Sequence, residues 1–443
     1  MEDCLGNPVT LADAAHLPQV DDFVGGFLSC EARVANVLQA QGDDSPYLQA
    51  CCAALHMFAE SPEGVVNARP FIARALASPL KITPREQRFV AAVAAWVDGN
   101  LPLAVRLHEE QAQVFPRDLA SVKLGQYHVF NHGDAPTMLR LALAARPAAA
   151  DVPYLHGMLA FGYEQCHLLR HAEEAAHRAI RLCRKEPWAQ HALAHVMLTE
   201  GRLTEGQAFM REHSDTWTGL NSFMVTHNWW HTALFALELD DGDEVLRLYD
   251  QQVWGVVKAY SQDQINAVSL LARLELAGID VGNRWQDLGH YLAQRTQDQV
   301  QPFLDMQYLY GLARSGLPQA DTLMQNITLR ASQAAPGQPV EARWARIALP
   351  ACQGLLAHAR GRWEEALQGL GAALPRLAEI GGSHAQRDLF EQIYLDALWQ
   401  AGHRSATQHL WQQRVNQQPE SRRLRRQASV LYRQLGLALP DAP

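Results

Sequence analysis

The sequence predicts an all-α fold, a superhelical α-solenoid of consecutive tetratricopeptide-type helix pairs. Two observations carry this prediction. Ala- and Leu-rich stretches with helical spacing alternate with short breaks, as in residues 186–213. Long stretches with period-2 alternation and many β-branched residues, which would indicate strands, do not occur in the sequence. We therefore expect paired helices and no sheet of consequence.

The length of the chain fits a repeat array better than one compact core. At 443 residues, the chain exceeds the usual size of a single hydrophobic core. A repeat array avoids that limit because each unit packs only on its neighbours. We expect residues 1–75 to form an N-terminal helical cap of degenerate repeats. Residues 76–443 are expected to form continuous tetratricopeptide-like helical repeats, with the weakest match at residues 281–340.

The repeat pattern is clearest in residues 186–213. Trp188, Ala194, Gly201 and Gly206 occupy the aromatic, small, turn and small positions of a tetratricopeptide repeat. Small residues at these positions let two helix backbones approach closely. Further copies with the same order of small residue, turn and small residue are residues 157–180, 349–374 and 389–415. A separate turn is predicted at residues 98–104.

Composition and charge exclude several classes of protein. The chain is 48% hydrophobic and 19% charged, which is typical of a globular protein. Its net charge of −9 argues against sequence-independent binding to nucleic acid. The seven cysteines include no CxxC pair and indicate a reducing compartment. Without an uninterrupted apolar run of about 18 residues, we expect no membrane span and a cytoplasmic location.

Two histidine pairs are the best functional signal in the sequence. His191 and His195 are four residues apart, as are His227 and His231 in the next repeat. Residues at this spacing share one face of a helix. In tetratricopeptide repeats the first helix of each pair lines the concave face, and the small positions place His191, His195 and His227 there, with His231 on the flank of its helix. The same alignment places Trp230 and, one repeat earlier, Glu164 on adjacent concave patches.

This constellation allows metal binding, acid–base chemistry or hydrogen bonding to a ligand. Zinc takes three or four N, O or S ligands, and His191, His195, His227 and His231 could supply them. A divalent metal such as zinc is therefore a possible cofactor, although the sequence contains no HExxH motif. The same four histidines and Glu164 are the catalytic candidates if the site is enzymatic. The alternative is that each histidine is an ordinary core residue.

A second polar element begins a late helix. Two glycines at residues 381–382 permit a tight turn, and Ser383 can cap the helix that follows. A helix start with Arg387 nearby suits a carboxylate or phosphate group. The alternative is a structural cap in which Arg387 and Asp388 tie repeats together.

Five segments, taken in order, resemble the tetratricopeptide repeat protein thirty-eight family. They cover most of residues 80–400 and are residues 82–105, 191–210, 227–238, 281–288 and 381–398. The resemblance implies an all-helical solenoid. It does not imply a particular reaction, because none is established for the family. It places the polar landmarks of the family on His191, His195, His227, Asn228, Trp230, His231, Arg284, Trp285, Ser383, Gln386, Arg387, Asp388 and Glu164. Thr232 stands where these relatives have an aromatic residue, so one wall of a pocket would differ.

The leading functional hypothesis is a ligand-binding protein with a histidine-rich polar pocket on the concave face. Its partner would be a small, anionic molecule or a peptide segment, held by the histidines together with Trp230, Asn228, Arg387, Gln386, Ser383 and Asp388. The alternative is an enzyme that uses the same pocket by metal-assisted or histidine acid–base chemistry. A third hypothesis is a pure protein-interaction scaffold with structural histidines.

Overall fold

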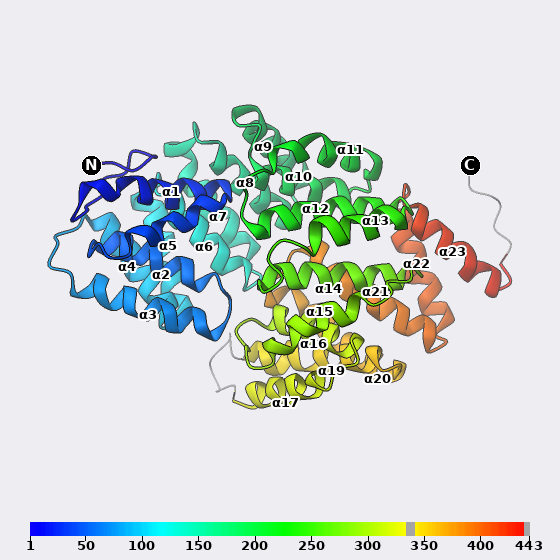
Figure 1. Cartoon of the computed structure of the whole chain (residues 1–443). Helices are drawn as coiled ribbons and strands as arrows, with labels where there is room; N and C mark the ends of the chain where they lie inside the picture. Colours follow the sequence, from blue (N-terminus) through cyan, green and yellow to red (C-terminus); the bar gives the residue numbers. More distant parts are fainter. Residues whose placement is uncertain (334–341, 438–443) are drawn as a thin grey trace. The chain divides into compact units, whose positions relative to one another are not determined.

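The computed structural model describes residues 1–333 and 342–437, and its regular structure is helical (Figure 1). Consecutive helices pack against one another along the chain. Within the described ranges there is no β-strand, only two isolated bridges, Glu2–Pro8 and Glu31–Leu220. The prediction of an all-α solenoid is confirmed. No helix in these ranges combines the length and the apolar character needed to cross a membrane.

The helices form two compact units. The first unit comprises residues 1–193 and 213–225, and the second comprises residues 194–212 and 226–443. The division passes through two helices, α10 (Pro187–Thr199) and α12 (Ser222–Glu238). The expected distinction between a cap at residues 1–75 and regular repeats at residues 76–443 stays a prediction.

The first unit contains the N-terminal helices. Several begin at a side chain that accepts a hydrogen bond from the first turn, including Thr83, Asn100, Asp118 and Asp134. Its helices are α1 (Leu17–Ser29), α2 (Pro46–Met57), α3 (Pro62–Ala77), α4 (Pro84–Val97), α5 (Leu101–Val114), α6 (Leu119–Phe130), α7 (Ala135–Ala149), α8 (Pro153–Gln165) and α9 (Leu169–Leu182), with 3₁₀ turns η1 (Ala14–His16), η2 (Ala32–Ala40) and η3 (Ser214–Thr216).

The second unit contains the remaining helices. Its regular helices are α11 (Leu203–His213), whose last residue falls across the division, α13 (Gly242–Leu248), α14 (Ser261–Leu276), α15 (Arg284–Leu292), α16 (Pro302–Arg314), α17 (Gln319–Ser332), α19 (Leu349–Ala359), α20 (Trp363–Ala373), α21 (His384–Gln400), α22 (Arg404–Gln417) and α23 (Arg422–Gln434). Short turns of other helix types are η4 (Tyr249–Val253), η5 (Ala293–Arg295), η6 (Trp344–Ala348) and η7 (Leu374–Ile380).

The small residues and turn glycines of the repeat pattern lie where the sequence predicts them. Ala194 is fully buried, and a side chain at Gly206 would collide with the ring of Phe235. Gly201 and Gly361 adopt φ values of +71° and +70° between their helices. These values are in the left-handed region that glycine reaches without strain, so glycine is needed at both turns.

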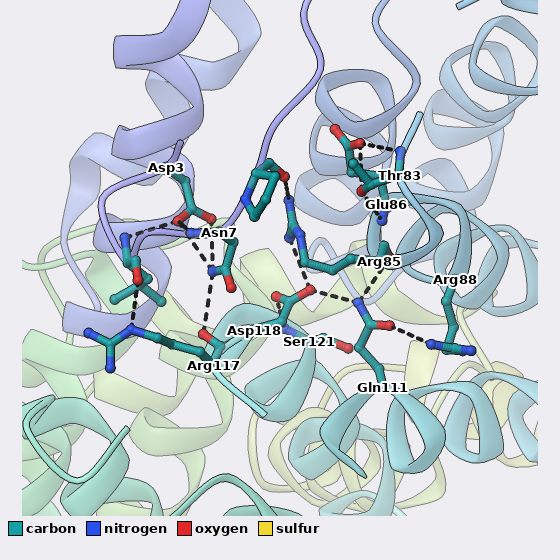
Figure 2. A network of polar contacts seen from close by, with 12 residues as sticks. Asp3, Asn7, Thr83, Arg85, Glu86, Arg88, Gln111, Arg117, Asp118 and Ser121 are labelled. Carbon is teal, nitrogen blue, oxygen red and sulfur yellow. Dashed lines mark hydrogen bonds and ion pairs between the residues drawn. The ribbon is translucent and has the colours of Figure 1, made fainter. Parts of the chain in front are cut away.

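A buried polar network fastens the N-terminal residues to the first unit (Figure 2). Arg85 forms a 3.0 Å ion pair with Asp118, and both side chains are 2% exposed. The same guanidinium donates to the carbonyl of Pro8, and Gln111 donates to Asp118. Because each charged group is hydrogen-bonded as well as paired, the network holds the N-terminal segment against α4 and α6 without an unpaired charge.

The last helices of the second unit return to its first residues. Arg423 on α23 pairs with Glu238 at 2.6 Å, and Gln418 donates to the carbonyl of Leu198. Glu420 accepts from the backbone N–H groups of Leu203 and Thr204 at the start of α11. A repeat array normally has contacts only between neighbours. Contacts across about 185–220 positions of sequence therefore close the second unit upon itself.

Candidate functional site

Three of the predicted histidines come together in the second unit. His195 lies on α10, and His227 and His231 lie one turn apart on α12. The ring centroids of His195 and His231 are 4.5 Å apart, and those of His227 and His231 are 4.8 Å apart. One ring nitrogen from each of the three lies within 4.8 Å of the others. All three side chains are at most 2% exposed, so they form a buried histidine site.

A chain of hydrogen bonds sets the tautomer of His227. Thr226 donates to the carboxylate of Asp263 at 2.9 Å, and Asn266 donates its amide N–H to Thr226 at 3.4 Å. The amide oxygen of Asn266 must then accept from Nδ1 of His227, at 2.9 Å. In this tautomer the ring lone pair of His227 lies on Nε2.

Burial keeps His227 neutral. Desolvation lowers the pKa of His227 to about 3, although the hydrogen bond that His227 donates to Asn266 acts in the opposite direction. A neutral imidazole is the form that ligates metals and accepts protons. At neutral pH this ring is therefore in the state that either chemistry requires.

Two polar groups beside the histidines have no hydrogen-bond partner among the residues that the structure describes. Asn228 is fully buried, and neither atom of its amide has a partner in the described part of the chain. The same holds for Nε1 of the fully buried Trp230. Successive helix residues are 100° apart, so His227 and His231 lie between Trp230 and Asn228 on the surface of α12. An unpaired buried amide costs about 1–3 kcal/mol, which a bound polar group would offset.

A buried arginine joins this site to α21 and α22. The guanidinium of Arg273 lies over the ring of Trp230, 5.5 Å from its centroid, and donates to the carbonyl of Ala385. Burial lowers the pKa of Arg273 to about 10. Asp388 lies 4.0 Å from Arg273 and 2.7 Å from Arg414. Burial acts to raise the pKa of Asp388, but Arg414 and Arg273 hold it below its usual value.

The second polar element forms a structural cap at the start of α21. Ser383 and Gln386 form a reciprocal capping box, and Arg387 donates to the carbonyls of Gly381 and Gly382. His384, the first residue of α21, lies beside the histidine site. Its ring lies 5.4 Å from that of His195, and its Nε2 is 3.1 Å from the hydroxyl of Thr199. The glycine turn thus positions His384 beside α10.

The remaining predicted residues lie elsewhere. His191 is one turn before His195 on α10 and packs in the first unit against Phe161 and Trp188. Glu164 is buried on α8 of the first unit. Their grouping with the other three histidines stays a prediction. Arg284 pairs with Asp250 on the surface of the second unit, and the hydroxyl of Thr232 donates to the carbonyl of Asn228.

Sequence reasoning missed the contribution of α14. Asp263, Asn266 and Arg273 are buried polar residues of α14, and each supports the histidine site. They recur three, then seven positions apart, which places them on one helix face. Their helical spacing was the signal that could have identified them.

Comparison with known proteins adds little to this description. No family model matches the chain. Among solved structures it is similar to a chain of the structure of Naa15/Naa10 bound to HypK-THB, with 10% sequence identity and a TM-score of 0.26. The similarity covers 95% of this chain and 66% of that chain. The chain thus spans slightly less than two thirds of that longer protein, and this level of similarity assigns no function.

Proposed function

We propose that the protein binds a small polar molecule at the buried histidine site. The observation that carries the proposal is Asn228, whose fully buried amide has no partner among the described residues. The neutral imidazole of His227 lies beside Trp230 on α12, and Asn228 lies on the other side of the histidines, about 160° around the helix from Trp230. Burial of these groups favours a small molecule over a peptide segment.

The hydrogen-bonding groups of the site define the class of ligand. The Asn228 amide offers one acceptor and two donors, and Trp230 offers one donor. Arg273 adds positive charge over the Trp230 ring. A carboxylate or carboxamide would satisfy these donors, and a hydroxyl or amide N–H would satisfy the Asn228 oxygen. We therefore propose a small carboxylic acid or amide as the ligand.

Asn228→Leu tests this proposal. Native mass spectrometry of the purified protein should detect a stoichiometric small molecule in the wild type, and the variant should lose it. After removal of the ligand by refolding, Asn228→Leu should be at least as stable as the wild type, because it removes an unpaired buried amide. Asn266→Leu is the matched control: it removes a paired amide and should lower stability. A wild type without retained ligand, combined with a destabilised Asn228→Leu, would contradict the proposal.

The second candidate is a metal centre, which is favoured by the spacing of the three histidines. Their ring nitrogens lie within 4.8 Å of one another, and nitrogens on one zinc ion are at most about 4 Å apart. A small movement of the rings would make them ligands. His191, one turn before His195 on the same helix, is the proposed fourth ligand. A metal here would support the alternative hypothesis of an enzyme; without one, His227 could serve as a general base.

Cobalt substitution tests the metal centre. Metal-free protein titrated with Co²⁺ should develop the visible absorption of a tetrahedral nitrogen site with a stoichiometry of one. Asn266→Ala removes the partner of His227 Nδ1 and should weaken the affinity about 10–100-fold. Asn326→Ala, which removes an amide bonded to the carbonyl of Thr296 elsewhere in the second unit, is the control. Absence of this absorption would contradict the metal centre, and equal affinity in both variants would contradict the role of Asn266.

We also propose membership of the tetratricopeptide repeat protein thirty-eight family and a cytoplasmic location. The ordered set of five segments supports the first, and the unpaired, mostly buried cysteines support a reducing compartment. If ligand and metal are both absent, the interaction-scaffold hypothesis takes their place.

A further inference from the structure

The outer face of α23, drawn in red in Figure 1, carries a row of exposed arginines. Arg422, Arg425, Arg426 and Arg433 are all exposed. At 100° per residue, these four positions fall within about 100° of arc on one side of the helix, and the row is roughly 17 Å long. We call these four residues the arginine stripe.

Most of the charge of the arginine stripe is unmatched. Arg426 pairs with Asp240 at 2.7 Å. Arg422 and Arg425 form no ion pair within the described residues, and Arg433 donates to a carbonyl of its own helix. Several exposed arginines elsewhere in the second unit do pair with an acid: Arg247 with Glu244, Arg360 with Asp321, Arg362 with Glu365 and Arg376 with Glu379. The stripe thus concentrates positive charge in a chain whose net charge is −9.

Helix stability does not account for these arginines. The N-terminus of a helix carries a partial positive charge, so Arg422 and Arg425 are unfavourable in the first turn of α23. Like charges four residues apart, such as Arg422 and Arg426, also repel each other. The stripe therefore destabilises α23 unless a negatively charged partner lies against it.

A cavity opens beside the arginine stripe. Its volume is about 330 Å³, and it lies where α21, α22 and α23 meet the end of α14. Arg426 belongs to both the stripe and the cavity lining, and Val430, one turn later on α23, lines the cavity and is 39% exposed. The mouth of the cavity therefore borders the stripe. The apolar residues of the lining, which suit an apolar side chain, include Leu276, Leu395, Leu424, Leu431, Trp399 and Trp411.

We propose that this surface binds an acidic peptide segment that carries one aromatic or branched aliphatic side chain. The apolar side chain enters the cavity past Val430, and carboxylates on either side of it pair with Arg422, Arg425 and Arg433. An extended segment of about five residues covers the length of the stripe. Binding supplies the missing negative charges, and the ion pair of Arg426 stays intact.

The distribution of charge favours a peptide over nucleic acid. Nucleic acid carries negative charge along its whole length, and a chain with a net charge of −9 repels it outside the stripe. A short peptide confines its negative charge to the stripe and also provides the side chain that the cavity accepts.

Three synthetic peptides test the proposal on the full-length protein. The first has a phenylalanine between two pairs of glutamates; the second replaces the glutamates with glutamine; the third replaces the phenylalanine with serine. Calorimetric titration at low ionic strength should show the first binding about tenfold more tightly than either of the others, because each of those lacks one kind of contact. Added salt should weaken binding of the first peptide, because it screens exposed charges.

Two variants localise the binding. Arg422→Gln/Arg433→Gln should weaken binding of the first peptide about tenfold without lowering the melting temperature, because neither arginine has an acidic partner to lose. Val430→Asp puts a carboxylate at the cavity mouth and should abolish binding. Arg360→Gln/Arg362→Gln makes the same change of charge between α19 and α20, is the matched control, and should bind as the wild type does.

Three outcomes would overturn the proposal. Equal binding of the first and second peptides would mean that the stripe takes no part. Equal weakening in Arg422→Gln/Arg433→Gln and in its control would mean that net charge alone governs binding. A single-stranded oligonucleotide or a phosphatidylserine vesicle that binds the wild type more tightly than the first peptide does would identify a different class of partner. If Val430→Asp fails to fold, the peptides and the arginine variants still decide the question.

Discussion

At the scale of single residues, Glu186 should give the protein an unusual pH dependence. Glu186 is fully buried before α10 and accepts from the backbone N–H of Ala189, while its Oε1 has no partner in the described ranges. Burial raises its pKa to about 8 from 4.5. A raised pKa contributes stability below the unfolded-state pKa, and that stability is lost as pH rises through the folded-state pKa.

We expect Glu186→Gln to match the wild type near pH 4.5 and to be more stable near pH 9. As pH rises between about 4.5 and 8, Glu186 ionises in the unfolded chain but stays protonated in the folded one, which lowers stability, whereas the amide stays neutral throughout. Urea unfolding at a series of pH values measures the difference. Exposed Glu174→Gln is the control and should show none of this pH dependence. A constant difference between Glu186→Gln and the wild type at all pH values would be inconsistent with a buried, neutral Glu186.

The residues of the histidine site were only partly predictable. The four-residue spacing in the sequence identified His195, His227 and His231 because helical periodicity alone puts such pairs on one face. Asn266 and Arg273 escaped notice because their role depends on which helix packs beside α12, and periodicity within one helix carries no such information. The prediction for Arg387 left two alternatives open, and its bonds to the carbonyls of Gly381 and Gly382 support the structural one.

At the scale of elements, the start of α21 depends on glycine for two separate reasons. Gly382 has a φ of +72°, and a side chain there would also collide with the ring of Phe303. Gly402, after the same helix, has a φ of +81° and open space around it. The two positions flank one helix and differ in the collision alone.

Gly402→Ala should therefore cost only the backbone strain, about 1–2 kcal/mol. Gly382→Ala should cost that strain and about 1–3 kcal/mol more for overpacking. Chemical denaturation of both variants measures the difference. Since His384 follows Gly382 directly, Gly382→Ala should also disturb ligand binding at the histidine site. Equal losses of stability in the two variants would show that the ring of Phe303 moves aside without lowering the free energy of unfolding.

Helices and turns were more predictable than their packing. The turns at Gly99, Gly201 and Gly361 were evident because a glycine between two apolar periodic stretches ends one helix and starts the next. The predicted cap at Ser383 is present for the same local reason. The sequence did not indicate η2, a 3₁₀ segment at Ala32–Ala40, because its apolar spacing differs little from that of an α-helix.

At the scale of the whole molecule, long-range ion pairs should stabilise the closure of the second unit unequally. Glu238 and Arg423 are 9% and 3% exposed, whereas Asp240 and Arg426 are 27% and 47% exposed. Removing one partner of a buried pair costs about 3–5 kcal/mol, because the other charge stays buried. An exposed pair contributes about 0–1 kcal/mol.

We expect Glu238→Ala to lower the free energy of unfolding by about 3–5 kcal/mol and to increase hydrogen exchange in α23. Asp240→Ala, two residues away, should change either quantity little. Chemical denaturation combined with hydrogen exchange resolved along the chain measures both effects. Similar behaviour of the two variants would mean that Arg423 finds another partner when Glu238 is removed.

The return of α23 to Glu238 also fixes an order of events during synthesis. Residues 238 and 423 are 185 positions apart. At about 5–20 residues per second, the ribosome needs roughly 10–40 s to make the intervening chain. His195, His227 and His231 are translated well before α23, so for that interval their helices lack the segment that later closes the unit. During that interval the nascent chain holds Glu238 without the arginine that pairs with it in the finished protein.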